Sequence, residues 1–178
     1  MVYIAGPFFN VEQITLINNI RFVIEEAGLD FFSPKDECMF VPGVTTPEEV
    51  LDINMSALNK SKLLVCLTND KDPGTMFEAG YCYSIGVPII YIWLTDVKHK
   101  KFSQAIDRKD LSNAEKSELL QNEILKAHSS TRTTEKFNLM LGASGSVVRS
   151  MPQLFAALKE YKEIGFHRKN WGEEMNYE

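Results

Sequence analysis

The sequence contains few cysteines and histidines, the residues that most often form disulfides and metal sites. Its three cysteines, Cys38, Cys66 and Cys82, are widely spaced, odd in number and include no C-x-x-C pair. Cys66 and Cys82 lie within apolar runs, so we expect buried free thiols and a reducing, cytoplasmic compartment. The three histidines stand far apart in polar surroundings, and no metal-ligand spacing appears. We therefore predict no metal and no cofactor.

The sequence also lacks an excess of basic charge and any long hydrophobic run. Its 19 Lys and Arg and 24 Asp and Glu give a net charge of -5, spread along the chain, which argues against a nucleic-acid-binding surface. No stretch approaches the roughly 18 apolar residues that a membrane-spanning helix needs. The N-terminal segment MVYIAGPFFN has no basic region, so we do not expect a signal peptide. The sequence thus predicts that the protein binds neither nucleic acid nor membranes.

Short apolar runs alternate with amphipathic segments along most of the chain. Runs that are apolar on both faces, separated by amphipathic helices, are typical of a parallel sheet covered on two sides. The predicted strands are residues 1–5, 29–34, 62–68, 88–93 and 145–150, and the predicted helices are 10–27, 47–60, 76–85 and 151–162. We therefore predict an α/β fold, with an open five-stranded parallel sheet and helices on both faces (flavodoxin-like or Rossmann-like).

The 178 residues are expected to form one domain over residues 1–162, followed by a C-terminal tail at 163–178. Within the domain, residues 95–135 are charged, rich in Ser and Thr and poor in apolar residues. We interpret this segment as a surface insertion with a helix near 112–127 and a lid edge near 128–137.

Glu78 raises the main functional question. Thr75-Met-Phe-Glu78 fits the capping box, in which the glutamate only satisfies backbone donors at a helix start. However, a parallel sheet would place this helix start at the edge where ligands bind, together with Asp72 and the segment after the first strand. Paired carboxylates are suited to cleaving a bond at an anomeric carbon, and a helix N-terminus would keep Glu78 ionised. From these residues alone, helix cap and nucleophile both remain possible.

Three motifs resemble the nucleoside 2-deoxyribosyltransferase family: YIAGPFF at the N-terminus, DPGTMFEAGYCYSIGVPI in the middle and FNLML near the end. The resemblance covers residues 1–94 and 137–162. It implies that Glu78 is the nucleophile that attacks C1′ of a 2′-deoxynucleoside and forms a covalent deoxyribosyl-enzyme. It further implies that Tyr3 orients this glutamate and that Asp72 holds the 5′-hydroxyl of the sugar. The expected partners are deoxynucleosides and free nucleobases.

The resemblance also implies residues around the base and between subunits. Phe8 lies where the family often has an aromatic residue over the base, and the preceding Gly6 is assigned to the same substrate-binding set. Asn138 and Met140 match a pair that reaches into a neighbouring subunit's site, which implies a homo-oligomer.

One position departs from the family pattern. Many members have an aspartate on the second helix that helps to protonate the leaving base, whereas this chain has Asn54 there. We still assign Asn54 to the substrate-binding set, although an amide cannot deliver a proton as a carboxylic acid can. Asp52 is no substitute, because two residues along a helix it points to another side.

Three alternative functions remain open at this stage. A 2′-deoxynucleoside 5′-monophosphate N-hydrolase must accept a phosphate, for which Ser144 and Ser146 argue and the Asp72 carboxylate argues against. A non-catalytic nucleotide sensor would bind without turnover and tolerate Glu78→Gln. A flavodoxin-like electron carrier would need a phosphate-binding loop after the first strand, and the proline of Ala5–Phe9 makes that loop a poor one.

Overall fold

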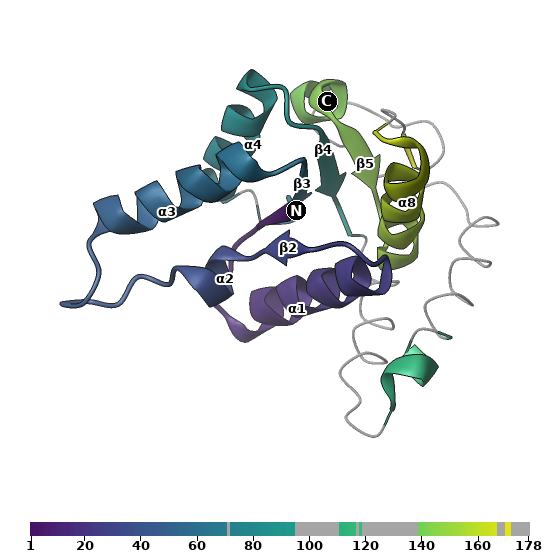
Figure 1. The fold of residues 1–178 in the computed structure, drawn as a ribbon, viewed down its shortest axis with the longest axis horizontal. Helices are drawn as coiled ribbons and strands as arrows, with labels where there is room; N and C mark the ends of the chain where they lie inside the picture. Colours follow the sequence, from purple (N-terminus) through teal and green to yellow (C-terminus); the bar gives the residue numbers. More distant parts are fainter. Residues whose placement is uncertain (71, 95–110, 117, 119–138, 167–169, 172–178) are drawn as a thin grey trace.

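The computed structural model describes residues 1–70, 72–94, 111–116, 118, 139–166 and 170–171. Its centre is a six-stranded sheet with the strand order β2-β1-β3-β4-β5-β6, and every neighbouring pair is parallel (Figure 1). The strands are β1 (Val2–Ala5), β2 (Phe31–Phe32), β3 (Leu63–Leu67), β4 (Ile89–Ile92), β5 (Ser146–Val148) and β6 (Asn170–Trp171).

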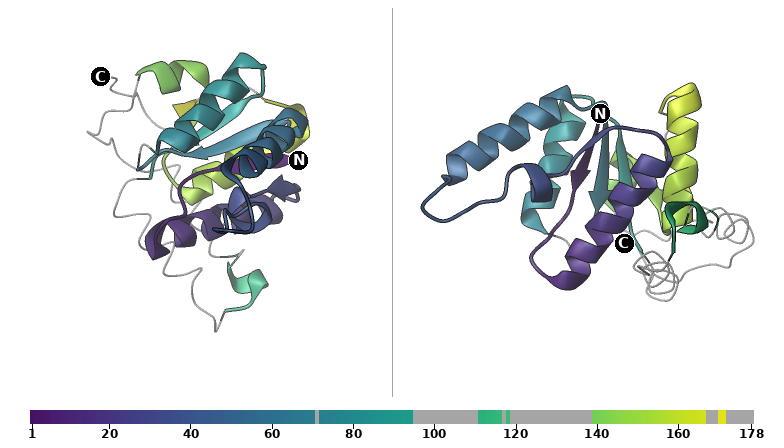
Figure 2. Two further views of the ribbon diagram at one scale, coloured as in Figure 1. Left: turned by 90° about the vertical axis from the view of Figure 1, so that its left-hand side faces the viewer. Right: turned by 60° about the horizontal axis from the view of Figure 1, so that its bottom comes forward.

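Helices cover both faces of this sheet. Along the described residues, the helices that accompany it include α1 (Val11–Glu26), α2 (Pro34–Glu37), α3 (Pro47–Lys60), α4 (Pro73–Ser84), α7 (Leu139–Ser144) and α8 (Met151–Ile164). Helices α1 and α8 pack against each other over one face, around a core that includes Ile20, Ile24 and Leu154. Helices α3 and α4 contribute Leu58, Ala79 and other residues to a second core on the opposite face (Figures 1 and 2).

Local sequence signals explain where these helices begin and end. Thr46 caps α3 with a complete capping box: its hydroxyl accepts the Glu49 N–H, and the Glu49 carboxylate accepts the Thr46 N–H. Asn10 and Ser150 cap α1 and α8 by a single bond each: their side-chain oxygens accept the N–H groups of Gln13 and Gln153. Gly28 follows the end of α1 at φ +70°, a left-handed conformation that a glycine adopts without steric cost.

The predicted fold class is confirmed, with two differences in detail. All five predicted strands are present in the parallel sheet, and a sixth short strand, β6, comes from the segment predicted to be a tail. Helix α4 begins at Pro73 and not at residue 76. Most of the predicted surface helix at 112–127 and the predicted lid edge lie outside the described residues. Among the helices that the structure describes, none has the length and hydropathy needed to cross a bilayer.

The strand order defines where a ligand would bind. The chain passes from β1 outward to β2, then returns across β1 to form β3, so the order reverses between β1 and β3. In open parallel sheets, ligands bind in the crevice outside the carboxyl ends of the two strands at such a switch point. Here that edge is formed by the segments after Ala5 and after Leu67, and α4 begins beside it.

Candidate active site

Tyr3 and Glu78 form the centre of the candidate site. The Tyr3 hydroxyl, from β1, donates a hydrogen bond of 2.5 Å to Glu78 Oε1, from α4. Tyr3 is fully buried, and its ring stacks on Phe32 of β2 with centroids 5.4 Å apart. The sheet therefore fixes the phenol, and the phenol fixes the carboxylate of Glu78.

The start of α4 rules out the capping-box interpretation of Glu78. The N-cap is Asp72, whose Oδ2 accepts the Thr75 N–H at 2.7 Å and the Thr75 hydroxyl at 2.8 Å. Pro73 occupies the first helical turn, where its missing N–H is harmless. Thr75 is therefore inside the helix and buried, not its cap, and the Glu78 carboxylate accepts a hydrogen bond from Tyr3 of β1.

The protonation of Glu78 differs from the expectation that a helix N-terminus would keep it ionised. The pKa of Glu78 is raised to about 7: burial raises it most, the Tyr3 hydrogen bond lowers it, and the negative charge of Asp72 raises it. The helix start explains the difference: α4 begins at Pro73, so Glu78 lies beyond the first turn, the part of a helix in which the dipole acts, and burial dominates its pKa. Tyr3 itself stays protonated, because burial and the adjacent Glu78 hold its pKa far above the usual value.

Gln13 is a residue at this edge that the sequence analysis did not single out. Its Oε1 accepts the Phe9 N–H at 2.8 Å, and its Nε2 donates to Asp70 at 2.8 Å. One side chain thus connects the loop after β1 to the loop after β3. No local sequence pattern indicates this role, because Gln13 and Asp70 meet only once the sheet has formed.

The predicted base-binding residues lie on the loop that Gln13 holds. Phe8 is half-buried and stacks on the exposed Phe9, with ring centroids 5.6 Å apart. Gly6 sits in a tight space, since a Cβ there would lie 2.8 Å from the Cδ1 of Ile17. Close packing of β1 against α1 therefore accounts for a glycine at this position.

Asn54 lies on α3 and contacts a cysteine. The Cys38 sulfur, just after α2, lies 2.8 Å from Asn54 Oδ1. Asp52, by contrast, lines a groove with Met1 and Phe32, and Asn54 is not among the residues that line this groove. Of the two residues expected to reach a neighbouring subunit, Met140 is 75% exposed on α7, and Asn138 lies outside the described residues.

The serine-rich stretch at 142–146 lies at the other end of the sheet. Ser144 bonds to the Tyr91 hydroxyl at 2.8 Å and to the Leu141 carbonyl at 3.0 Å, and Ser146 is buried as the first residue of β5. Neither serine lies at the carboxyl ends of β1 and β3. The stretch therefore gives no support to a phosphate site beside Glu78.

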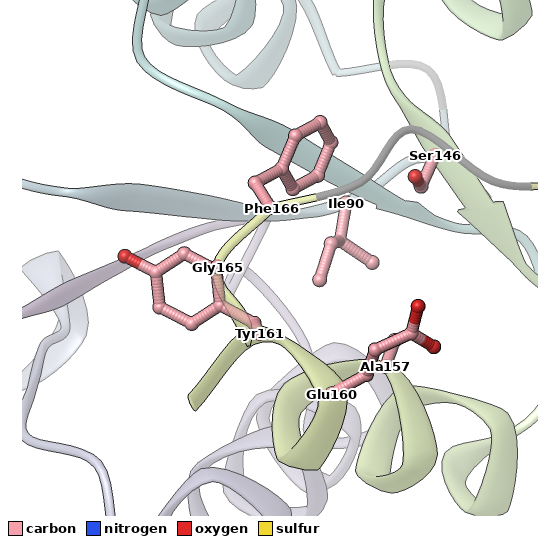
Figure 3. A pocket seen from close by; sticks show the side chains of 7 residues that line it. All are labelled: Ile90, Ser146, Ala157, Glu160, Tyr161, Gly165 and Phe166. Carbon is pink, nitrogen blue, oxygen red and sulfur yellow. The ribbon is translucent and has the colours of Figure 1, made fainter. Parts of the chain in front are cut away.

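A small cavity near the same end of the sheet is also unsuited to a nucleoside. It lies between the end of α8 and the beginnings of β4 and β5, where Ile90, Tyr161 and Phe166 surround it (Figure 3). Its volume is about 10 Å³, which leaves room for roughly one water molecule. In the part of the chain that the structure describes, no group of three His, Cys, Asp or Glu side chains could hold a metal ion.

Comparison with known proteins identifies relatives of this chain. The family model described as Nucleoside 2-deoxyribosyltransferase matches residues 2–140. No curated protein sequence matches the chain.

Two solved structures resemble the whole fold. One is a 2-deoxyribosyltransferase from Bacillus psychrosaccharolyticus, with 20% identity and a TM-score of 0.56, covering 88% of this chain and 94% of the other. The second is a conserved protein from Enterococcus faecalis V583, with 16% identity and a TM-score of 0.59, covering 89% of this chain and 96% of the other. At these identities the two structures support the fold.

Proposed function

The chain belongs to the nucleoside 2-deoxyribosyltransferase family, and we propose that it transfers a 2-deoxyribosyl group from one nucleobase to another. The observation that carries this proposal is the Tyr3–Glu78 hydrogen bond of 2.5 Å between β1 and α4, the helix that follows the carboxyl end of β3. It supplies a fixed carboxylate that can attack an anomeric carbon. A polar donor on one oxygen leaves the other oxygen of Glu78 available for the substrate.

In the proposed first step, the ionised Glu78 attacks C1′ of a 2′-deoxynucleoside. A bond forms between a carboxylate oxygen and C1′, while the C1′–N bond breaks and its electron pair leaves with the base. In the second step, a ring nitrogen of another base attacks C1′, the bond between C1′ and the carboxylate oxygen breaks, and Glu78 is released as a carboxylate. The incoming base gives up its N–H proton to solvent, and the departed base anion takes one from solvent. Two inversions at C1′ give net retention, and water in place of the second base gives hydrolysis.

The neighbouring residues have distinct roles in this proposal. Tyr3 stays protonated and holds Glu78 by its hydroxyl, which keeps the carboxylate aimed at C1′. Asp72 uses Oδ2 to cap α4, and we propose that Oδ1 accepts a hydrogen bond from the 5′-hydroxyl of the sugar. Phe8 would stack on the base at the same edge.

A base-exchange experiment tests this function. The protein is mixed with thymidine and free adenine, and the products are separated by chromatography. We expect 2′-deoxyadenosine with the β-configuration at C1′, as NMR would report. Free thymine without a new nucleoside would instead indicate hydrolysis. No reaction with a broad panel of deoxynucleosides and their 5′-monophosphates would contradict the proposal.

Asp72 variants separate the helix cap from substrate binding. Asp72→Asn should keep the cap, because Asn and Asp are equivalent N-caps, whereas Asp72→Ala should lower the free energy of unfolding by about 1 kcal/mol. Both variants should raise KM for thymidine, with Asp72→Ala losing about tenfold or more in kcat/KM. A 2′,5′-dideoxynucleoside is the control, since without a 5′-hydroxyl it should react equally with wild type and Asp72→Ala well above pH 7, where Glu78 is ionised in both proteins. Equal losses on both substrates would contradict the assigned contact.

We also propose that the protein assembles through α3. This helix extends from the body, with only Ala57 and Leu58 buried along it (Figure 1). Its flank exposes Leu51 and Ile53, and the preceding loop exposes further large apolar side chains, Met39, Phe40, Val41 and Val44. Beside α3 lies a groove of about 460 Å³ that Ile53 and Phe32 help to line. Exposed apolar surface of this extent marks an interaction site, and the family resemblance favours a second copy as the partner.

Sedimentation equilibrium tests this assembly. Wild type should sediment as an oligomer, and Ile53→Glu should shift it to the monomer, because a charge would be buried in the contact. Ile164→Glu is the matched control, since Ile164 is exposed at the far end of α8 and should not affect the mass. A monomeric wild type, or an Ile53→Glu variant of unchanged mass, would contradict the proposed contact.

A further inference from the structure

Cys38 lies next to the candidate active site and has no role in the mechanism above. It follows α2, is 8% exposed, and its sulfur lies 2.8 Å from Asn54 Oδ1. Burial, together with the negative charges of Glu78 and Glu37, raises the pKa of the Cys38 thiol. The side chain is therefore a neutral thiol that can donate its proton, and it lies within the electrostatic reach of Glu78.

This contact decides which way the Asn54 amide faces. A carboxamide has an oxygen that accepts and an NH₂ group that donates, and the two ends can be exchanged by rotating the group. A protonated thiol is a donor and sulfur is only a weak acceptor, so the short contact places the amide oxygen against Cys38. The NH₂ group is then turned away from the sulfur and offers two donors.

We propose that Cys38 is a positioning residue that holds Asn54 so that its NH₂ group donates to the leaving nucleobase. This inference rests on the proposed function and specifies how an asparagine serves it. The base departs with the electron pair of the C1′–N bond, and the NH₂ group stabilises its negative charge without transferring a proton. The anion then takes its proton from water.

Two consequences follow for base selection. The Asn54 donors would favour a base that presents a carbonyl oxygen or an unprotonated ring nitrogen at that point, and would disfavour one that presents a donor. Because no acid protonates the base as it leaves, the rate should depend steeply on the acidity of the base. Acidic bases, such as 5-halogenated uracils, should leave faster than thymine.

A double-mutant cycle on kcat/KM tests the inference, with 2′-deoxyuridine and its 5-methyl, 5-fluoro and 5-bromo derivatives as donors and adenine as acceptor. Cys38→Ala should lose about tenfold in kcat/KM, the value of one hydrogen bond, and should steepen the dependence on base acidity. Cys38→Ser should stay within about threefold of wild type, because its hydroxyl can donate to the same oxygen. In an Asn54→Ala background, Cys38→Ala should have no further effect.

Cys82→Ala is the matched control. Cys82 is a buried thiol one helical turn beyond Glu78, and in the described residues its sulfur has no bond to Asn54. Its effect should therefore add to that of Asn54→Ala. Thermal unfolding is measured for every variant, to test whether the fold is kept. Cys38→Ser serves as a second variant in the cycle, because it nearly preserves the volume of the side chain.

The outcomes separate the inference from the proposed function. Turnover by wild type, combined with additive effects of Cys38→Ala and Asn54→Ala or with failure of Cys38→Ser to restore activity, would overturn the role of Cys38 alone. An unchanged dependence on base acidity in Cys38→Ala would also overturn it. Absence of transfer and hydrolysis in wild type would overturn the proposed function and, with it, this inference.

Discussion

Replacing Glu78 with glutamine is expected to abolish deoxyribosyl transfer and, at the same time, to stabilise the folded protein above pH 7. An amide cannot attack C1′ as a carboxylate can, and loss of a nucleophile lowers kcat by about 10⁴-fold or more. The Tyr3 hydroxyl can still donate to the amide oxygen, so the geometry of the site should survive the change. Glu78→Gln should therefore lose the reaction while it keeps the fold.

The stability gain follows from the raised pKa of Glu78. The pKa is about 7 in the folded protein against an ordinary value of 4.5, so the folded state holds the proton more tightly. The resulting stabilisation is fully present below pH 4.5 and is lost as the pH rises through 7. The difference corresponds to about 3 kcal/mol of unfolding free energy. Glutamine carries no charge at any pH, so the variant should exceed wild type by about this amount at pH 8 and by little at pH 5.

Urea denaturation at pH 5 and pH 8 measures this effect. Glu25→Gln is the control, because Glu25 is exposed on α1 and the same substitution should change the unfolding free energy by less than about 0.5 kcal/mol at either pH. A Glu78→Gln variant that transfers deoxyribose normally would contradict the nucleophile assignment. If the advantage of Glu78→Gln over wild type in unfolding free energy were no larger at pH 8 than at pH 5, the raised pKa of the buried Glu78 carboxyl would be contradicted.

Replacing Tyr3 with phenylalanine is expected to move the pH dependence of the reaction upward and to lower the rate at neutral pH. The Tyr3 hydrogen bond lowers the pKa of Glu78, so its removal should raise that pKa above about 7. A smaller fraction of Glu78 is then ionised at pH 7. The lost hydrogen bond to a charged group corresponds to about 10- to 100-fold in kcat/KM.

The measurement is a profile of kcat/KM against pH for wild type and Tyr3→Phe. For wild type, the rate should rise with pH through about 7 as Glu78 ionises. For the variant, this rise should occur at higher pH, and part of the lost activity should return there. Tyr91→Phe is the control, because the Tyr91 hydroxyl bonds to Ser144 at the other end of the sheet. An acidic limb that stays in place in Tyr3→Phe would contradict the role of this bond.

The sequence predicted the sheet well because each buried strand leaves a local signal. Runs such as Leu63–Leu67 and Ile89–Ile92 are apolar on both faces, and every residue in them is buried. Strand β6 escaped prediction because its two residues lie in a polar segment, whereas the equally short β2 lies in an apolar run. Helix α3 was placed correctly from Thr46 and Pro47, which form its cap and first residue.

The same signals are present at α4, three residues before the helix start predicted from Thr75. Asp72-Pro73 is an N-cap followed by a proline at the first helical position, the pattern that located α3. Taking Thr75 as the cap displaced the helix by three residues and placed Glu78 in its first turn. At the observed helix start, Glu78 lies beyond the first turn, so burial and not the helix dipole dominates its pKa.

Other features of the site could not be predicted from local sequence. Residues 3 and 78 were paired by family resemblance, and no spacing between them would have indicated a hydrogen bond. Cys38 and Asn54 meet because α2 and α3 are brought together by the fold, as do Gln13 and Asp70 through the two loops. Such contacts depend on tertiary structure, which periodicity does not encode.

The most direct test of the central claim is peptide mass spectrometry of the protein quenched with acid during turnover of thymidine alone. The Glu78 nucleophile predicts one deoxyribosyl group on the peptide that contains Glu78, lost when adenine is added before the quench. Glu78→Gln should show no such adduct. An adduct on another residue, or an adduct that persists in Glu78→Gln, would contradict the account.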